Sequence, residues 1–217
     1  MGTLEPFLRA TSIIDWERPE VLAVARARAR GRRRHVDVAR ACFEWVRDVI
    51  PHTVDHGLES VTCSASEVLR AGTGICYAKS HLLAALLRAN GIAAGFVYQR
   101  LALAGDGSAF CLHGLNAVRL PGMGWYRIDA RGDRDDLRAG FDPPREALPF
   151  ACVVAGERVF PGIWADPVPV VVEALRRSRT RADLEAGLPD AADLDPTAGT
   201  VVESRPSSGR SRSTNGS

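Results

Sequence analysis

The sequence predicts an α+β fold, with helices first along the chain and an antiparallel sheet after them. Apolar residues recur at helical spacing in the first 90 residues, whereas three segments between residues 94 and 130 are rich in strand-forming residues. The turn-forming segment Pro121–Gly124 separates the last two of these. This order is typical of a domain whose helices pack against one antiparallel sheet.

Length and composition favour one soluble domain with a substantial core. The chain has 217 residues, 46% of them hydrophobic, and a formal net charge of +2, which is too small to indicate nucleic acid or membrane partners. It shows no apolar run of membrane-spanning length, and its N-terminus is too charged for a signal peptide. Five cysteines, an odd number without close pairing, fit a reducing compartment. We therefore expect a cytoplasmic protein that binds neither nucleic acid nor membranes.

Three helices are expected before residue 72. The first runs from Pro19 to about Arg30 and begins with Pro-Glu, and the second runs from Val36 to Ile50 with one apolar stripe. A capping box from Ser64 to Glu67 opens a short third helix.

A fourth helix is expected to be buried almost all round. Apolar residues recur at helical spacing from Ala78 to Ala89 and fill most of the remaining circumference, and Asn90-Gly91 supplies the stop. Gly72-Thr73-Gly74 permits a tight turn before it, with Thr73 as the expected cap. Cys76 would then lie in the first turn, where free amides and the helix dipole favour a negative charge such as a thiolate.

The strands are expected at residues 94–103, 112–120 and 125–130, and the last two form a hairpin. His113 and Asp129 lie nearly equidistant from the centre of its turn, so we expect them to be cross-strand neighbours or one step apart. Together with Cys76 they would supply a nucleophile, a base and a residue that orients the base.

Two further helices are expected at roughly Val168–Arg177 and Arg181–Ala186. Residues 190–217 change in character and end in Ser, Arg and Gly without core-forming residues, which predicts a disordered tail. The expected organisation is therefore one domain over residues 1–189, followed by this tail.

The stretch SASEVLRAGTGICYAKSHLLAALLRANGIAAGFVYQRL resembles the core of the transglutaminase-like superfamily, and the resemblance covers residues 40–131. The His in CLHGLNAVRL and the Asp in GWYRIDA fall where that family keeps its second and third catalytic residues. The resemblance implies that Cys76 is the nucleophile, His113 the general base and acid, and Asp129 the residue that orients the imidazole. It also implies a papain-like α+β domain in which the nucleophile helix packs against the sheet. We expect no cofactor.

Three other polar residues are candidates for the site. The family's oxyanion-stabilising side chain has no clear match, and His52 is our candidate, beside the backbone N–H of Cys76. Lys79 lies one helical turn after Cys76 and either faces the thiolate and substrate or is an ordinary solvated or carbonyl-bonded lysine. Arg131 either contacts substrate or pairs with Asp133.

Two alternative readings concern the remaining chemistry-bearing residues. His52, Asp55, His56 and Cys63 have ligand-like spacing, but no second tight pair accompanies them, so we expect no metal. The cysteines other than Cys76 are expected to be buried packing residues: Cys42, Cys63, Cys111 and Cys152.

The expected function is cysteine-dependent acyl transfer through a thioester on Cys76. The reaction is hydrolysis of an amide or peptide bond, or transfer of the acyl group to an amine. The partners would be a peptide or amide-containing acyl donor and, for transfer, an amine acceptor. The alternative is a non-catalytic binding module of the same fold, because the superfamily includes members that lack the triad.

Overall fold

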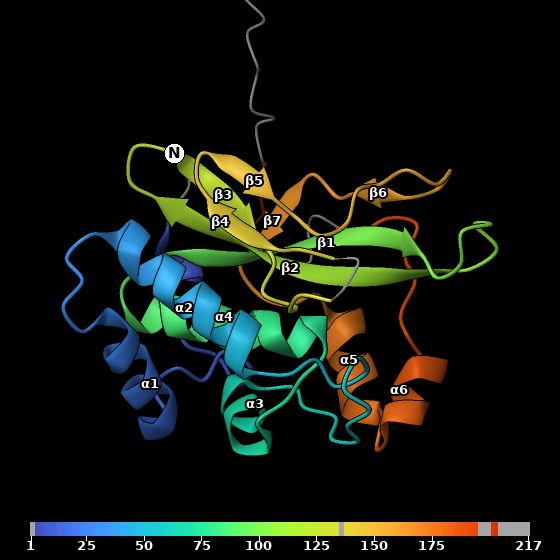
Figure 1. The fold of residues 1–217 in the computed structure, drawn as a ribbon, viewed down its shortest axis with the longest axis horizontal. Helices are drawn as coiled ribbons and strands as arrows, with labels where there is room; N and C mark the ends of the chain where they lie inside the picture. The colour runs from blue at the N-terminus through green and yellow to red at the C-terminus, as the bar shows by residue number, and fades with distance from the viewer. Residues whose placement is uncertain (1–2, 135–136, 195–200, 204–217) are drawn as a thin grey trace, which may run out of the picture.

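The computed structural model describes residues 3–134, 137–194 and 201–203 and confirms the α+β fold. The helices gather on one side of a sheet (Figure 1). A 3-10 turn, Glu5–Phe7, precedes them, and the helices are α1 Pro19–Ala29, α2 His35–Val49, α3 Ala65–Ala71, α4 Cys76–Ala89, α5 Pro169–Arg177 and α6 Arg181–Ala186. Each predicted helix is present, with its ends within one or two residues of the expected positions.

The sheet is antiparallel throughout, with the strand order β3-β2-β1-β7-β8, and β6 also pairs with β1. A separate two-stranded sheet joins β4 and β5. The strands are β1 Ala94–Ala102, β2 Phe110–Leu120, β3 Gly124–Ile128, β4 Gly140–Asp142, β5 Arg145–Ala147, β6 Arg158–Val159, β7 Gly162–Trp164 and β8 Val201–Glu203. The five strands after β3 were not expected, because they are only two or three residues long and show no clear alternation.

Helix α4 is the centre of the core, as its apolar circumference predicts. Every residue from Tyr77 to Arg88 is buried, and the helix packs against α1, α2 and α3 as well as β1 and β2. It ends at Asn90 and Gly91, whose φ of +70° is the left-handed conformation that glycine adopts without strain. The expected cap is wrong: the N-cap residue is Ile75, and no side chain caps the helix. Thr73 donates instead to the carbonyl of Pro51, at 2.9 Å.

The β2–β3 hairpin places residues 113 and 129 on one face. Asn116 pairs with Ile128 and Leu120 with Gly124. If this pairing is extended by one residue beyond the end of β3, Leu115 lies opposite Asp129. His113 comes two residues before Leu115 in β2 and is therefore the diagonal neighbour of Asp129. Because side chains alternate with a period of two, this shift keeps both side chains on the same face.

The predicted tail begins in contact with the sheet. The Pro189 carbonyl accepts a hydrogen bond from the Leu112 amide, at 2.7 Å, and Arg100 donates two hydrogen bonds of 2.6 Å to the Asp190 carboxylate. Strand β8 pairs with β7, whereas residues 195–200 and 204–217 of the predicted tail lie outside the described residues. Within the described parts of the chain, none of the helices combines the length and apolar character that crossing a membrane requires.

Candidate active site

Cys76 is the first residue of α4, as predicted. The first hydrogen bond of the helix runs from the Lys79 amide to the Ile75 carbonyl, at 2.9 Å, so the amides of residues 76–78 precede the helical ladder. These amides and the helix dipole favour negative charge at this end. The side chain of Cys76 is partly exposed, in contrast to the buried residues that follow it. A reacting group can therefore approach its sulfur.

The predicted contact between His113 and Asp129 is present. The His113 Nε2 and Asp129 Oδ2 atoms lie 2.6 Å apart, and the two residues are 5% and 1% exposed. Asp129 follows the last residue of β3, and its second oxygen, Oδ1, accepts the backbone N–H of Arg131 at 2.9 Å. Both carboxylate oxygens are therefore held, which fixes the plane of the group that orients the imidazole.

The imidazole of His113 also interacts with the side chain of Cys76. Burial alone lowers the pKa of His113, but the Asp129 carboxylate and Cys76, each by charge and by a side-chain hydrogen bond, raise it to about 10. Burial raises the pKa of Asp129, yet His113 and the Arg131 amide hold it below its usual value. Because Nε2 of His113 is bonded to Asp129, Nδ1 is the ring nitrogen left for the thiol.

Phe150 packs edge-on against the imidazole and was not anticipated. Its ring centroid lies 4.8 Å from that of His113 at an interplanar angle of 71°, and the Arg131 guanidinium lies 5.6 Å from the same ring. The Phe150 carbonyl accepts a hydrogen bond of 3.2 Å from Gln99, the residue opposite His113 in β1. Phe150 belongs to an irregular segment without hydrophobic periodicity, so the sequence carried no signal for this contact.

The segment that contains His52 runs beside the turn before Cys76. His52 forms an isolated parallel bridge with Gly74. The Thr53 amide donates to the Gly74 carbonyl at 3.2 Å, and the Gly74 amide donates to the Pro51 carbonyl at 3.4 Å. Residues 51–53 are thus tied to the backbone two residues ahead of the cysteine.

The His52 side chain is 11% exposed and uncharged. Burial lowers its pKa to about 2, and the nearby cations Arg131 and Lys79 act in the same direction. Its Nδ1 atom lies 3.5 Å from both the amide nitrogen and the Oδ2 atom of Asp55. Nε2 is therefore the ring nitrogen left for another partner.

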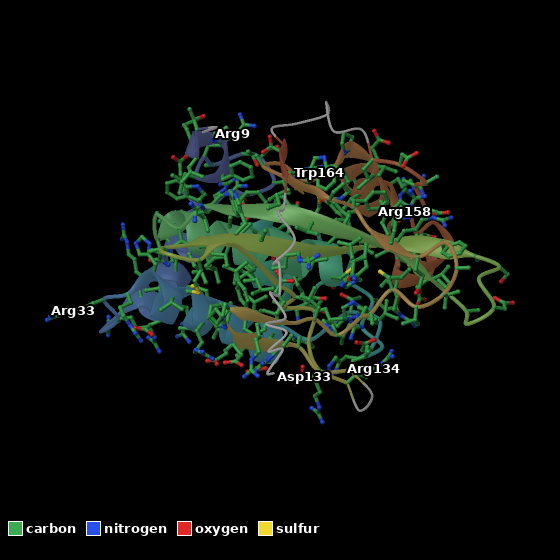
Figure 2. All side chains as sticks on the ribbon, turned by 90° about the horizontal axis from the view of Figure 1, so that it is seen from above. Arg9, Arg33, Asp133, Arg134, Arg158 and Trp164 are labelled. Carbon is green, nitrogen blue, oxygen red and sulfur yellow. The ribbon has the colours of Figure 1, made fainter. Side chains whose placement is uncertain are left out.

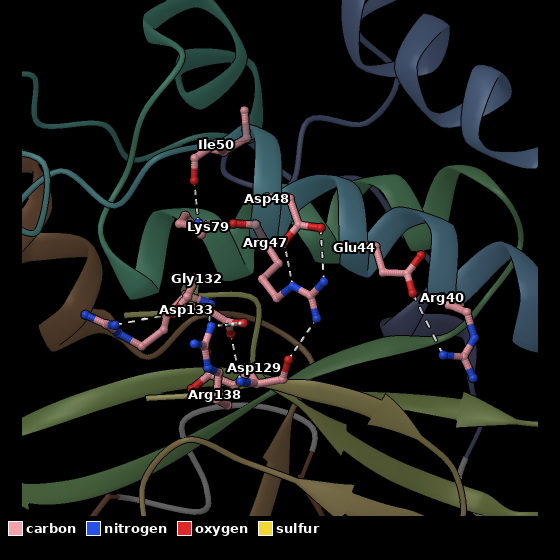
Figure 3. A network of polar contacts seen from close by, with 12 residues as sticks. Arg40, Glu44, Arg47, Asp48, Ile50, Lys79, Asp129, Gly132, Asp133 and Arg138 are labelled. Carbon is pink, nitrogen blue, oxygen red and sulfur yellow. Dashed lines mark hydrogen bonds and ion pairs between the residues drawn. The ribbon is translucent and has the colours of Figure 1, made fainter. Parts of the chain in front are cut away.

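Of the two arrangements expected for Lys79, the structure shows the one in which its ammonium is hydrogen-bonded to main-chain carbonyls. Its side chain is fully buried, and its Nζ atom donates to the carbonyl of Ile50 and, at 3.3 Å, to that of Arg47 (Figure 3). Burial lowers the pKa of Lys79 to about 7. Because two main-chain carbonyls occupy the ammonium, the structure argues against the expected contact with substrate.

Arg131 pairs with Asp55, and the expected pair with Asp133 is wrong. Arg131 Nη2 lies 2.7 Å from Asp55 Oδ2, and the arginine is 6% exposed. Asp133 instead accepts the Ala139 amide at 2.9 Å and lies near Arg138, at the edge of the molecule (Figure 2). This ion pair joins the His52 segment to the chain that follows Asp129. Because Asp55 occupies the guanidinium of Arg131, that group has little capacity left to bind substrate.

A cleft of about 300 Å³ opens beside these groups. Its wall includes His52, Lys79 and Arg131, together with residues of the 51–56 segment and the 131–133 loop. The lining segments lead to His52 and Asp129, so the recess lies next to the candidate site and is large enough for part of a substrate.

The other four cysteines differ in exposure. Cys42 and Cys63 are buried as predicted, and burial raises their pKa values to about 12 and about 11. The expected full burial of Cys111 is wrong, because its side chain is partly exposed, although burial still raises its pKa to about 12. The expected burial of Cys152 is wrong, because this side chain lies exposed in the irregular segment after Phe150.

No metal site emerges in the described parts of the chain, where no three His, Cys, Asp or Glu side chains form a group that could hold an ion. Two members of the alternative ligand set take part in protein contacts: Asp55 pairs with Arg131, and His52 Nδ1 lies 3.5 Å from Asp55 Oδ2.

The sequence profile of the transglutaminase-like superfamily matches residues 23–130, a region that starts before the expected boundary at residue 40. No curated protein matches the chain. A candidate cysteine protease from Cytophaga hutchinsonii is similar in structure, with 20% identity and a TM-score of 0.48, over 60% of this chain and 43% of that one.

Two further solved structures are similar over part of the fold. A candidate protease from Parabacteroides distasonis has 12% identity and a TM-score of 0.40, over 64% of this chain and 29% of that one. The M. smegmatis arylamine N-acetyltransferase has 21% identity and a TM-score of 0.40, over 51% of this chain and 45% of that one. The chain spans less than half the length of each of these three proteins.

Proposed function

The chain belongs to the transglutaminase-like superfamily, and we propose that it catalyses acyl transfer through a thioester on Cys76. The observation that carries the proposal is the buried 2.6 Å contact between His113 and Asp129, with Cys76 interacting with the same imidazole at the start of a helix. Nucleophile, base and orienting group in this relation are the arrangement that cysteine acyl transfer requires.

The first half of the reaction forms the thioester. The proton of the Cys76 thiol resides on His113, as the raised pKa of the imidazole favours, and the sulfur attacks the carbonyl carbon of the acyl donor, whose oxygen becomes negative. The imidazolium then donates its proton to the leaving nitrogen of an amide, the C–N bond breaks, and an amine departs. Asp129 stabilises the imidazolium, consistent with the direction in which it shifts the pKa of His113.

The second half returns the enzyme to its starting state. Neutral His113 removes a proton from water or from an acceptor amine as that molecule attacks the thioester carbonyl. The C–S bond breaks, and the proton remains on His113, which restores the starting pair with Cys76. Hydrolysis and transfer use the same residues, and we propose hydrolysis of an amide or peptide bond as the primary reaction, with an amine as the alternative acceptor.

The oxyanion would be stabilised by the backbone N–H of Cys76 and by His52. Amides in the first turn of a helix are not used by the helical ladder, and donors aimed at a developing negative charge contribute strongly in a water-poor site. His52 is neutral and keeps Nε2 available, so it can act as a hydrogen-bond donor without proton transfer.

An acyl-trapping experiment tests this proposal. The protein is mixed with p-nitrophenyl acetate, and intact-mass and peptide mass spectrometry follow the acetyl group. We expect one acetyl group on Cys76 that disappears with time, and none on Cys76→Ala. A Cys152→Ser variant, which removes an exposed thiol, should acetylate like the wild type. Absence of acetyl-Cys76 in the wild type would favour the non-catalytic binding module instead.

A further inference from the structure

The ammonium of Lys79 lies where three segments of the candidate active site meet. Lys79 is the only lysine of the chain, and its side chain is fully buried on α4, one turn after Cys76. Its Nζ atom donates to the carbonyls of Arg47 and Ile50 (Figure 3). Arg47 lies in the last turn of α2 and Ile50 is its C-cap residue, so these carbonyls belong to the end of the helix where main-chain acceptors lack helical partners.

A third segment packs on the same ammonium. A Cβ at Gly132 would lie 3.4 Å from Lys79 Nζ and 3.5 Å from the Arg47 carbonyl oxygen. The φ of Gly132 is +110°, in the region that side chains disfavour, so glycine permits both this close approach and the turn of the chain. The loop after β3 therefore rests on the junction of α2 and α4.

Each of the three segments leads within a few residues to a group of the proposed mechanism. Lys79 follows Cys76 on α4. Ile50 precedes His52, whose segment is bonded to Gly74. Gly132 follows Arg131, whose amide holds Asp129.

We propose that Lys79 is a positioning residue, whose ammonium fixes the α2 end and the 131–132 loop relative to Cys76. The inference rests on the proposed acyl transfer, because it assigns Lys79 a task in aligning that site. Lys79 itself does not touch the reacting atoms in this mechanism. A misplacement of about 1 Å among catalytic groups can cost on the order of 10²-fold in rate, so a support shared by three segments has a measurable effect.

The position of the ammonium makes this support sensitive to pH. Burial lowers the pKa of Lys79 to about 7, while the Asp129, Asp48 and Asp55 carboxylates raise it and Arg131 lowers it. His52 also faces it and is neutral, and the guanidinium of Arg47 is paired with Asp48. Above pH 7 the bonds to the two carbonyls lose their charge assistance and weaken.

Stability and catalysis should therefore respond to pH in opposite ways. The folded-state pKa of Lys79 lies below the ordinary value of 10.5, so between about pH 7 and 10.5 the unfolded chain binds more protons than the folded chain. The contribution of Lys79 to the free energy of unfolding rises over that window. The alignment of the site weakens over the same window. His113, with a pKa of about 10, does not account for a change near pH 7.

Lys79→Met tests the proposal because methionine is of similar length and lacks the donor. Arg88→Met is the matched control: Arg88 is a buried cation near the far end of α4 that also donates to main-chain carbonyls, those of Ala94 and Ala165. We expect Lys79→Met to slow both iodoacetamide labelling of Cys76 and kcat with p-nitrophenyl acetate by about 10- to 100-fold, with a smaller change in KM. Arg88→Met should leave these rates near wild type despite a lower Tm.

The pH profile separates alignment from general packing. In the wild type, kcat should fall above a midpoint near pH 7, and this limb should be absent in Lys79→Met. Wild-type rates and an unchanged profile in folded Lys79→Met would overturn the proposal. If Lys79→Met does not fold, Lys79→Gln is used in its place. A wild-type protein whose kcat does not fall above about pH 7 would by itself overturn the proposal.

The labelling measurement keeps the two hypotheses apart. Iodoacetamide reports on Cys76 whether or not the protein accepts an acyl group. A wild type that is labelled at Cys76 but never acetylated contradicts the proposed function, while slower labelling in Lys79→Met still supports the positioning role. Equal labelling of the two proteins alongside normal acetylation of the wild type would contradict only the role of Lys79.

Discussion

Tyr77 fills the space into which a side chain at Gly114 would point. A Cβ at position 114 would lie 2.8 Å from Tyr77 Cδ1, well inside van der Waals contact, and the Tyr77 hydroxyl donates to the carbonyl of Leu112. Tyr77 follows Cys76 on α4, and Gly114 follows His113 on β2. This contact therefore sets the distance between the helix and the strand that carry the two groups of the proposed proton transfer.

Substitution Gly114→Ala should disturb that spacing. The added methyl group overpacks the interface, which typically costs about 1–3 kcal/mol of stability, and it pushes the strand away from the helix. We expect a lower Tm and slower iodoacetamide labelling of Cys76. Gly105→Ala is the control, because a Cβ at that loop glycine meets nothing within 4 Å. A Gly114→Ala protein with the Tm and labelling rate of the wild type would show that the interface between α4 and β2 accommodates an added methyl group.

Asp129→Asn should lower the pKa of His113 from about 10, because the carboxylate is the largest of the influences that raise it. An asparagine also supports the wrong imidazole tautomer, so we expect turnover to fall on the order of 10²- to 10⁴-fold while the fold persists. Titration of the His113 ring protons by NMR and the rate with p-nitrophenyl acetate measure the two effects.

The sign of the accompanying stability change follows from the raised pKa. The ion pair contributes fully below about pH 6.5 and its contribution is lost as pH rises through about 10. The stability difference between wild type and Asp129→Asn should therefore shrink over that window. A full turnover rate in the variant would reduce Asp129 to a structural residue.

Cys76 should be the fastest of the five cysteines to react with iodoacetamide near pH 6. The helix start and the His113 imidazolium stabilise negative charge on its sulfur as it reacts, whereas burial raises the pKa values of the thiols at Cys42, Cys63 and Cys111. Cys152 is the informative comparison, because it is exposed and its pKa is also raised. Peptide mass spectrometry gives each rate.

The control for this labelling experiment is His113→Ala, which removes the ion-pair partner and leaves the helix end intact. Labelling of Cys76 should slow, while labelling of Cys152 should not change. Equal rates at the two cysteines in the wild type would mean that Cys76 has no special reactivity.

The ion pair between Arg131 and Asp55 should support the site without binding substrate. Arg131→Met leaves the Asp55 carboxylate largely buried, with Arg134 3.8 Å away, and loss of one partner of a buried pair costs up to about 3–5 kcal/mol. The double variant Arg131→Met/Asp55→Leu should recover part of the lost Tm. Because Asp55 occupies the guanidinium, we expect a lower kcat with little change in KM. A large rise in KM alone would restore the substrate-contact reading.

Local patterns were sufficient for the elements that carry the proposed triad of Cys76, His113 and Asp129. The apolar circumference of α4, its preceding glycines and the Asn90-Gly91 stop placed Cys76 at a helix start, because these signals act over a few residues. The hairpin turn brought His113 near Asp129, and only the parity of the register mattered for putting them on one face. Gly114 also carried a usable signal, since a glycine inside a strand often marks a close backbone approach.

The contacts that surround the proposed triad were decided by the tertiary structure. The sequence places Lys79 one helical turn after Cys76. The contact of its ammonium with the end of α2, however, depends on how α2 and α4 pack. Arg131 finds Asp55, 76 residues away in the chain, and not its near neighbour Asp133. Phe150 reaches His113 from a segment without periodicity. Such partners depend on which surfaces the core brings together, and side-chain spacing along the sequence does not encode that choice.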